Sequence, residues 1–336
     1  MTYNQLKDQI IKLLMREKQK GILQAELERK LRFSRSHISE TLKKLKSERK
    51  VEVRKVSSNI NRLWLPIYFP GTLDYQVRIG ILRSSEYVVH LSDIMEILEN
   101  ENKIFAIRVY ESSIDLLQDL NQSLLEIVMA PFYPSLLNSL IYANPIICPI
   151  ASGGSAIVSL QGENLLYVSE TSTMAKFAQI YISSNKNIKM VSMGSMKKNI
   201  ERFLKDGGLI ALWEPYLTIA LTKYNVEIKA RYVDVLFDLP CCVITFSRQF
   251  YKIRNDLASK IKKIRPQKTN GDKSLQFKDK ISKILDFEEP VILKSLNSYH
   301  YFTEGYSNFS IDSEKLGIYL TKGQKQEIFP LVDSIE

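Results

Sequence analysis

The chain has few of the residues that disulfide frameworks and metal centres need. Its 336 residues include three cysteines, of which Cys241 and Cys242 are adjacent and Cys148 stands alone. This set does not build a disulfide framework and suits a reducing compartment. All three lie in apolar runs, where we expect small buried side chains. The histidines are equally sparse and have no metal-ligand spacing, so the sequence predicts no metal site and no cofactor: His37, His90 and His300.

Long apolar runs are also missing. The first residues lack the apolar core of a signal peptide, and no stretch approaches the roughly 18 apolar residues that span a bilayer. These absences predict a cytoplasmic protein without a membrane partner. No nucleophile motif of the G-x-S-x-G type occurs either, so the sequence predicts a non-enzyme.

The excess positive charge is concentrated at one end. Residues 1–66 hold 17 Lys and Arg against 7 Asp and Glu, whereas the remaining 270 residues hold 30 of each. This asymmetry predicts one basic module that meets a polyanion and a neutral part with another task. The alternative is a basic surface that serves solubility.

Residues 1–66 have the pattern of three helices and a hairpin. Apolar residues at helical spacing predict helices over residues 3–18, 22–31 and 35–48. Ser34 stands at the N-cap of the third helix, and alternating residues after Lys50 predict two strands around a turn at residues 57–59. Helix, helix, turn, helix and hairpin is the order of a winged helix-turn-helix domain, which is an α+β fold.

The third helix and the hairpin carry groups that suit DNA. A helix in the major groove presents hydrogen-bonding side chains at its N-terminus, with basic residues beside it for phosphates. The predicted DNA-binding residues are Ser34, Arg35, Ser36, His37, Lys43, Lys44, Arg54, Lys55 and Arg62. Residues 25–45 resemble the winged-helix domains of MarR-like and ArsR-like regulators, which implies DNA-binding transcription regulation. The alternatives are a solvated charged face and a winged helix that binds protein.

The rest of the chain alternates strands and helices. After a linker at residues 67–76, apolar strands and helices alternate to about residue 150, and a second round begins near Leu165. This rhythm predicts two α/β lobes with mostly parallel sheets. We expect a bilobal domain over residues 77–336, with its second lobe at about 161–240.

Residues 77–250 resemble the type 2 periplasmic-binding-protein fold, in the branch of nitrate-, sulfonate- and thiamine-pyrimidine-binding proteins. The resemblance rests on residues 78–82, 119–130, 169–173 and 209–215. The chain departs from that branch at Gln122 and Ser123, which replace a common glycine, and at its N-terminus, where the winged helix replaces the secretion signal.

A cleft between the lobes is the expected ligand site, because ligands of open α/β sheets lie beyond the carboxyl ends of strands. Hydroxyls at a helix start suit an anionic group, and aromatic residues suit a flat ring. Helix capping and core packing are the alternative roles of these residues. The predicted ligand-binding residues are Arg83, Ser84, Phe132, Tyr133, Ser152, Thr171, Ser172, Thr173, Trp213 and Glu214.

The combined prediction is a cytoplasmic transcription regulator that senses a small polar or anionic ligand, with or without a ring. Duplex DNA and a small-molecule effector are its predicted partners. A homodimer is expected because palindromic DNA sites match two-fold symmetry. One alternative is a cytoplasmic enzyme of the pyrimidine- or menaquinone-biosynthesis type on the same bilobal fold. Another is a binding protein that delivers solute to a transporter, against which stands the missing export signal. The basic segment at residues 252–283 is either a second DNA-contacting surface or a solvated helix.

Overall fold

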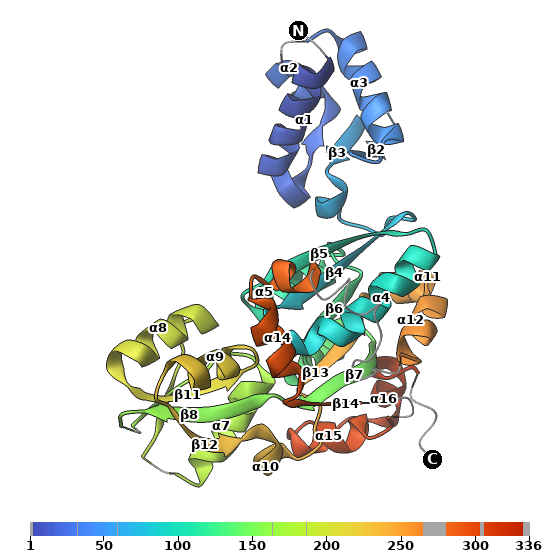
Figure 1. The fold of residues 1–336 in the computed structure, drawn as a ribbon. Coiled ribbons are helices and arrows are strands. Elements are labelled where there is room, and N and C mark those ends of the chain that lie inside the picture. Colours follow the sequence, from blue (N-terminus) through green and yellow to red (C-terminus); the bar gives the residue numbers. More distant parts are fainter. Residues whose placement is uncertain are drawn as a thin grey trace.

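The computed structural model describes residues 3–31, 33–58, 60–162, 164–185, 187–264, 280–302 and 306–331. These residues form an N-terminal module and two α/β lobes, and the module stands at one end of the molecule, above the first lobe in the view of Figure 1. Among the described residues, no helix has the length and apolar character that a membrane crossing requires.

The N-terminal module packs three helices on a small antiparallel sheet. Its elements are α1 (Tyr3–Glu17), β1 (Ile22–Leu23), α2 (Gln24–Leu31), α3 (Arg35–Ser47), β2 (Glu52–Ser57) and β3 (Ile60–Trp64). The strand order is β1-β3-β2. Leu6, Ile10 and Leu14 of α1 meet Ile38 and Leu45 of α3 in a fully buried core, because both sets recur at helical spacing.

The second helix starts later than the sequence predicts. Ile22 and Leu23 pair with Leu63 and Arg62 as a short strand. Gly21 ends the preceding segment with a positive φ of 60°, and a Cβ there would lie 2.5 Å from Nε1 of Trp64. Only glycine fits this close approach, so the chain turns and becomes extended before α2.

The connection between the module and the first lobe is a packed structure. A short 3-10 helix, η2 (Pro66–Tyr68), leads from β3 to β4 (Gln76–Leu82). The fully buried Arg78 on β4 donates to the carbonyls of Pro66, Phe69, Gly71 and Ser123. Its charge is balanced by the buried Glu126, 2.5 Å away. The linker is therefore anchored to the first lobe by one side chain.

The first lobe is built on a six-stranded mixed sheet. Its strand order is β14-β7-β13-β6-β4-β5, with parallel pairing of β4 with β5 and β6 and antiparallel pairing of β13 with β6 and β7. Besides β4, these strands are β5 (Ile104–Tyr110), β6 (Ile127–Pro131), β7 (Ile146–Gly153), β13 (Cys242–Phe246) and β14 (Tyr299–Tyr301). The sheet is thus less parallel than predicted, since β13 returns from the second lobe and inserts between β6 and β7.

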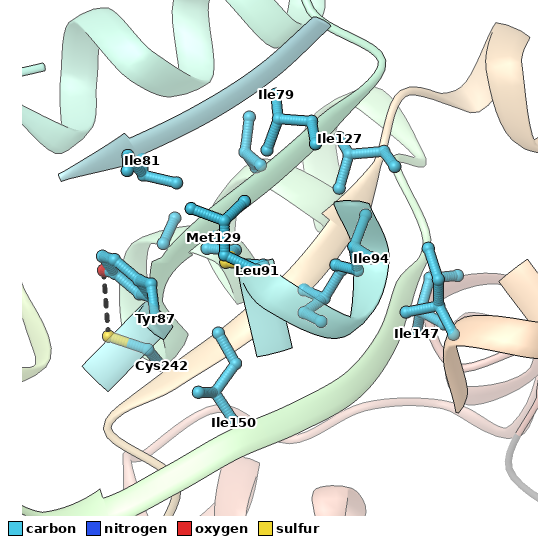
Figure 2. Packing of buried hydrophobic residues seen from close by; sticks show 14 of the residues in the cluster. Ile79, Ile81, Tyr87, Leu91, Ile94, Ile127, Met129, Ile147, Ile150 and Cys242 are labelled. Carbon is cyan, nitrogen blue, oxygen red and sulfur yellow. Dashed lines mark hydrogen bonds between the residues drawn. The ribbon is translucent and has the colours of Figure 1, made fainter. Parts of the chain in front are cut away.

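Helices cover the first sheet. They are α4 (Val88–Asn100), α5 (Ser113–Asn121), α6 (Phe132–Tyr142), α11 (Arg248–Ile253), α12 (Asn255–Lys262) and α14 (Glu289–Leu296). Figure 2 shows Leu91 and Ile94 of α4 packed toward Ile79, Ile127 and Met129 of the sheet. Burial of one such side chain contributes about 1.5–3 kcal/mol, so this core is the main support of the lobe.

The second lobe has its own five-stranded sheet in the order β10-β9-β11-β8-β12. It begins with β8 (Ser155–Leu160), before the expected start near residue 161, and continues through β9 (Leu165–Tyr167), α7 (Thr173–Ser183), β10 (Lys189–Val191), α8 (Met196–Asp206), β11 (Gly208–Trp213), α9 (Tyr216–Lys223), β12 (Glu227–Arg231) and α10 (Tyr232–Leu236). Near the C-terminal end, α15 (Phe309–Lys315) and α16 (Lys322–Ile328) pack where the lobes meet.

Two expectations about local structure change. Phe132 and Tyr133, two of the predicted ligand-binding residues, form the start of α6, where Pro134 is tolerated because the first turn needs no amide from it. The basic segment begins in two helices: Ile253 at the end of α11 is exposed, whereas Leu257 and Ile261 of α12 are buried. Residues 265–279 of that segment, including Arg265, Lys268, Lys273 and Lys278, lie outside the described residues.

Candidate ligand-binding site

A cavity of about 40 Å³ lies where the two lobes face each other. The space is enough for about three waters, so it suits an ion or one small polar group. The first lobe contributes Leu82, Arg83, Ser84, Glu86, Tyr87, Tyr110, Glu111, Ser113 and Pro131. The remaining wall is Ser155, Ser169, Ser172, Thr173, Met174, Met196, Trp213, Tyr216, Cys241 and Cys242.

The start of α7 forms the polar wall on the second lobe. Ser172 is the N-cap: its hydroxyl accepts from the amide of Ala175 and donates to the carbonyl of Ser169. The Thr173 hydroxyl donates to the carbonyl of Cys241 at 3.0 Å and accepts from the amide of Tyr133. The first amides of a helix have no partner within the helix and carry its positive dipole end. This wall therefore favours an anionic or strongly polar group.

Thr171, just before this helix, has an unusual backbone. Its φ of 47° lies in the left-handed region, which is strained for a β-branched residue. Its carbonyl accepts a hydrogen bond of 2.8 Å from the hydroxyl of Ser113 in the first lobe. The strained residue thus connects the two lobes at the cavity rim.

Trp213 closes the cavity from the end of β11. Its indole Nε1 donates to the carbonyl of Arg83 across the lobes at 2.9 Å. Tyr216 packs edge-on against it at 5.9 Å between ring centroids. The Arg83 guanidinium is held by Glu111 at 2.7 Å and by the carbonyl of Leu285 at 3.0 Å. Burial, the largest single influence, lowers the pKa of Arg83. The contacts with the carboxylates of Glu111 and Asp286 together outweigh it, so the pKa is raised.

Glu214 is a second contact between the lobes. Its carbonyl accepts one hydrogen bond from the amide of Ser85 and one from the hydroxyl of Ser84, both at 3.3 Å. Its carboxylate accepts from the Ser298 hydroxyl and from the amide of Thr218. Burial raises the pKa of this carboxyl, although these donors lower it. Glu214 therefore fixes the closed arrangement from behind the cavity wall.

Two thiols and a carboxyl group meet in the wall, and we call Glu86, Cys241 and Cys242 the thiol–carboxylate cluster. One potential ligand atom from each residue lies within 4.8 Å of the others, and Sγ of Cys241 is 2.9 Å from Oε1 of Glu86. Burial raises the pKa of Glu86 to about 7 and that of Cys242 to about 11. Of the cavity groups, this cluster is the set suited to hold a soft metal ion.

The cavity brings together half of the predicted ligand-binding residues: Arg83, Ser84, Ser172, Thr173 and Trp213. The other five lie outside its lining. Phe132 is buried against Phe309 because α6 begins there, and Tyr133 has its ring under Lys176. Ser152 is buried in β7, and its hydroxyl has no partner among the described residues, while Thr171 and Glu214 join the lobes through their carbonyls.

Sequence reasoning missed the thiol–carboxylate cluster of Glu86, Cys241 and Cys242. It also missed three neighbours on the first lobe: Tyr87, Tyr110 and Ser113. Glu86 and Cys241 are 155 positions apart, so no local spacing signals their contact. The available signal was the pair of adjacent cysteines at the start of a strand that returns between the lobes.

A second hollow of about 320 Å³ lies by the turn at Gly153 and Gly154. Arg231, Ser298 and His300 are among its lining residues. It lacks the α7 start and the aromatic pair of Trp213 and Tyr216. The smaller cavity therefore offers more converging groups that select a ligand.

The predicted DNA-binding residues all lie on the N-terminal module. Ser34 caps α3 by accepting from the amide of His37, and Ser36, Lys43 and Lys55 are exposed. Several of the basic groups have partners within the module. Arg35 contacts Glu28, Arg54 contacts Glu52, Lys44 lies over the ring of Tyr3, and Arg62 donates to the carbonyl of Lys20.

Solved structures share the arrangement of the two lobes. No protein-family model matches the chain, and no curated protein matches it in sequence. The two lobes have a type 2 periplasmic-binding-protein-like fold. The periplasmic aliphatic sulphonate-binding protein of Escherichia coli has a TM-score of 0.60 at 11% identity, over 79% of this chain and 94% of its own.

Two further structures have the same fold. The zinc-bound ligand-binding component of an ABC-type import system from Staphylococcus aureus has a TM-score of 0.58 at 12% identity, over 76% of this chain and 96% of its own. The periplasmic nitrate-binding protein of Synechocystis has a TM-score of 0.53 at 9% identity, over 75% of this chain and 84% of its own.

These neighbours correct the predicted function. They are solute-binding proteins, two of them periplasmic, whereas the sequence predicts a cytoplasmic DNA-binding regulator. The predictions of transcription regulation, of duplex DNA as a partner and of a cytoplasmic location are therefore wrong. The predicted homodimer loses its basis, because it rested on palindromic DNA sites. The net charge of residues 1–66 was misleading, since charge alone does not specify a partner.

Proposed function

We propose that the two lobes form a solute-binding domain that closes on a small polar or anionic molecule and leaves it chemically unchanged. The observation that carries this proposal is the hydrogen bond from Nε1 of Trp213 to the carbonyl of Arg83 across the cavity. It joins the lobes beside the start of α7, where an anion is favoured. A ligand that touches both lobes stabilises the closed state by its differential affinity for that state.

The size of the cavity narrows the ligand class. Drug-sized ligands occupy pockets of about 300–1,000 Å³, far above the 40 Å³ here. A small oxyanion or a sulfonate head group is a better match in size and charge. The neighbours that bind sulphonate and nitrate support the same class.

The division of the chain into domains is also part of this proposal. We propose a winged-helix module at residues 1–66, a linker at 67–76 and the bilobal domain at 77–336. The order of α1, α2, α3 and the β2–β3 hairpin supports the module, and the anchoring of Arg78 supports its attachment to the first lobe.

Calorimetric titration with nitrate and with ethanesulfonate tests the function. Ser172→Ala removes the hydroxyl that orders the α7 start, and we expect about tenfold weaker binding of whichever anion binds the unaltered protein, which is near 1.4 kcal/mol. Ser34→Ala is the matched control, because it also removes an N-cap serine but lies on the N-terminal module. Equal losses in both variants, or no binding of either anion by the unaltered protein, contradict the proposed site.

A further inference from the structure

We propose that the thiol–carboxylate cluster of Glu86, Cys241 and Cys242 is a zinc site in the wall of the cavity. The inference stands without the proposed solute binding, since its probe is zinc alone. It rests on two thiols and a carboxyl group that converge from distant parts of the chain.

The geometry is near that of a tetrahedral zinc site. Zn–S bonds of about 2.3 Å and Zn–O bonds of about 2.0 Å place neighbouring sulfur and oxygen ligands about 3.5 Å apart. Sγ of Cys241 is 2.9 Å from Oε1 of Glu86, and the three ligand atoms all lie within 4.8 Å of one another. The observed separations therefore bracket the spacing that a tetrahedral zinc ion needs.

The backbone explains how two adjacent thiols reach one point. Successive side chains of a regular strand point to opposite faces. Cys241, however, precedes β13, which begins at Cys242, and the register with β7 shifts between Cys242 and Val243. Irregular registers of this kind re-aim side chains and recur next to functional sites. Both thiols consequently line the same cavity.

Burial disfavours free thiolates here, so the charge of the bound ion and one polar neighbour must stabilise them. The Tyr87 hydroxyl lies 3.3 Å from Sγ of Cys242, a contact drawn as a dashed line in Figure 2, and can donate to it once that sulfur is ionised. Zinc binding releases the thiol protons to solvent, because the ion binds sulfur as thiolate. Two thiolates and one carboxylate leave a fourth zinc position for water or for a solute donor.

The ligand types select among metals. Thiolates favour Zn²⁺ and Cu⁺, whereas Mg²⁺ and Ca²⁺ prefer oxygen ligands. We therefore expect one zinc per chain and no measurable displacement of it by a large excess of magnesium. Cobalt, as a zinc substitute, should show thiolate-to-cobalt charge-transfer absorption.

The test is a zinc titration of the full chain, reduced and freed of metal, against a competing chelator. Cys241→Ser and Glu86→Gln should each weaken zinc binding by more than about a hundredfold, beyond the effect of outer ligand contacts. Cys148→Ser is the matched control, because Cys148 is also a buried free cysteine but lies outside the cavity lining. It should keep the affinity of the unaltered protein.

Two outcomes of the zinc titration overturn the inference. One is no stoichiometric zinc in the unaltered protein. The other is equal affinity in all variants, which would place the ion elsewhere. If Cys241→Ser does not fold, Glu86→Gln decides the test, because glutamine keeps the shape of the glutamate side chain. Circular dichroism shows whether this variant is folded, and its cobalt spectrum shows whether the metal ligands have changed. An unaltered cobalt spectrum in a folded Glu86→Gln protein also counts against the site.

Discussion

The N-terminal module has exposed ion pairs, whereas the first lobe also contains a fully buried one. In the module, ion pairs such as Arg35 with Glu28 and Lys50 with Glu48 lie at the surface, and the Arg35 side chain is 87% exposed. In the first lobe, Arg78 and Glu126 form a pair whose side chains are 0% and 2% exposed. Exposed pairs contribute little to stability, whereas loss of one partner from a buried pair is costly. Where a charge lies therefore says more about its role than how many charges a region holds.

The largest effect in this comparison should come from Arg78→Met. The change leaves Glu126 as a buried charge without its partner and removes donors to the carbonyls of Phe69, Gly71 and Ser123. We expect the free energy of unfolding to fall by about 3–5 kcal/mol, as measured by urea denaturation.

The double variant Arg78→Met with Glu126→Leu separates the two causes. It removes the uncompensated charge but still leaves the linker carbonyls without donors, so we expect only partial recovery. Full recovery would show that the carbonyl contacts matter little. A loss in the single variant no larger than that of an exposed arginine would remove the distinction between the two regions.

The next largest effect concerns a buried histidine and pH. Burial of His90 on α4 lowers its pKa from 6.5 to about 4, and its Nδ1 has no hydrogen-bond partner in the described structure. Between pH 6.5 and about 4, His90 is protonated in the unfolded chain but stays neutral in the folded chain. The contribution of neutral His90 to stability is therefore full above pH 6.5 and is lost as pH falls to about 4. Linkage gives about 3 kcal/mol for this shift.

The measurement compares unfolding free energies of the unaltered protein and His90→Leu from pH 7 to 4. The difference between the two curves should change by about 3 kcal/mol. Taking this difference removes the contribution of other groups such as Asp93, whose pKa is raised by burial to about 6. His300→Leu is the control, because His300 is exposed on β14. Parallel curves for all three proteins contradict the prediction.

The sequence predicts the regular elements better than the site. Helices α1, α3 and α4 and strand β4 follow from periodic apolar residues that depend on local sequence. Strand β8 was missed because it directly follows Gly153 and Gly154, which are typical of a turn, although every residue from Ser155 to Ser159 is buried. The helix start was visible as an N-cap at Ser172 or Thr173, and the structure shows that the cap is Ser172. The contact of Glu86 with Cys241 depends on how β13 returns between β6 and β7, which no local pattern encodes.

The smallest effect should come from Arg35→Met on the N-terminal module. Nε of Arg35 lies 2.9 Å from Oε2 of Glu28, close to the 3.0 Å between Nε of Arg78 and Oε2 of Glu126 in the buried pair. Water screens this pair, and ordering the long side chain costs conformational entropy, so we expect a loss of about 0.5 kcal/mol or less in the same urea denaturation. Raising the salt concentration should reduce that loss further, because exposed charges are screened within about 10 Å at 0.1 M salt. A loss near that of Arg78→Met would mean that distance, not burial, determines the energy of an ion pair in this protein.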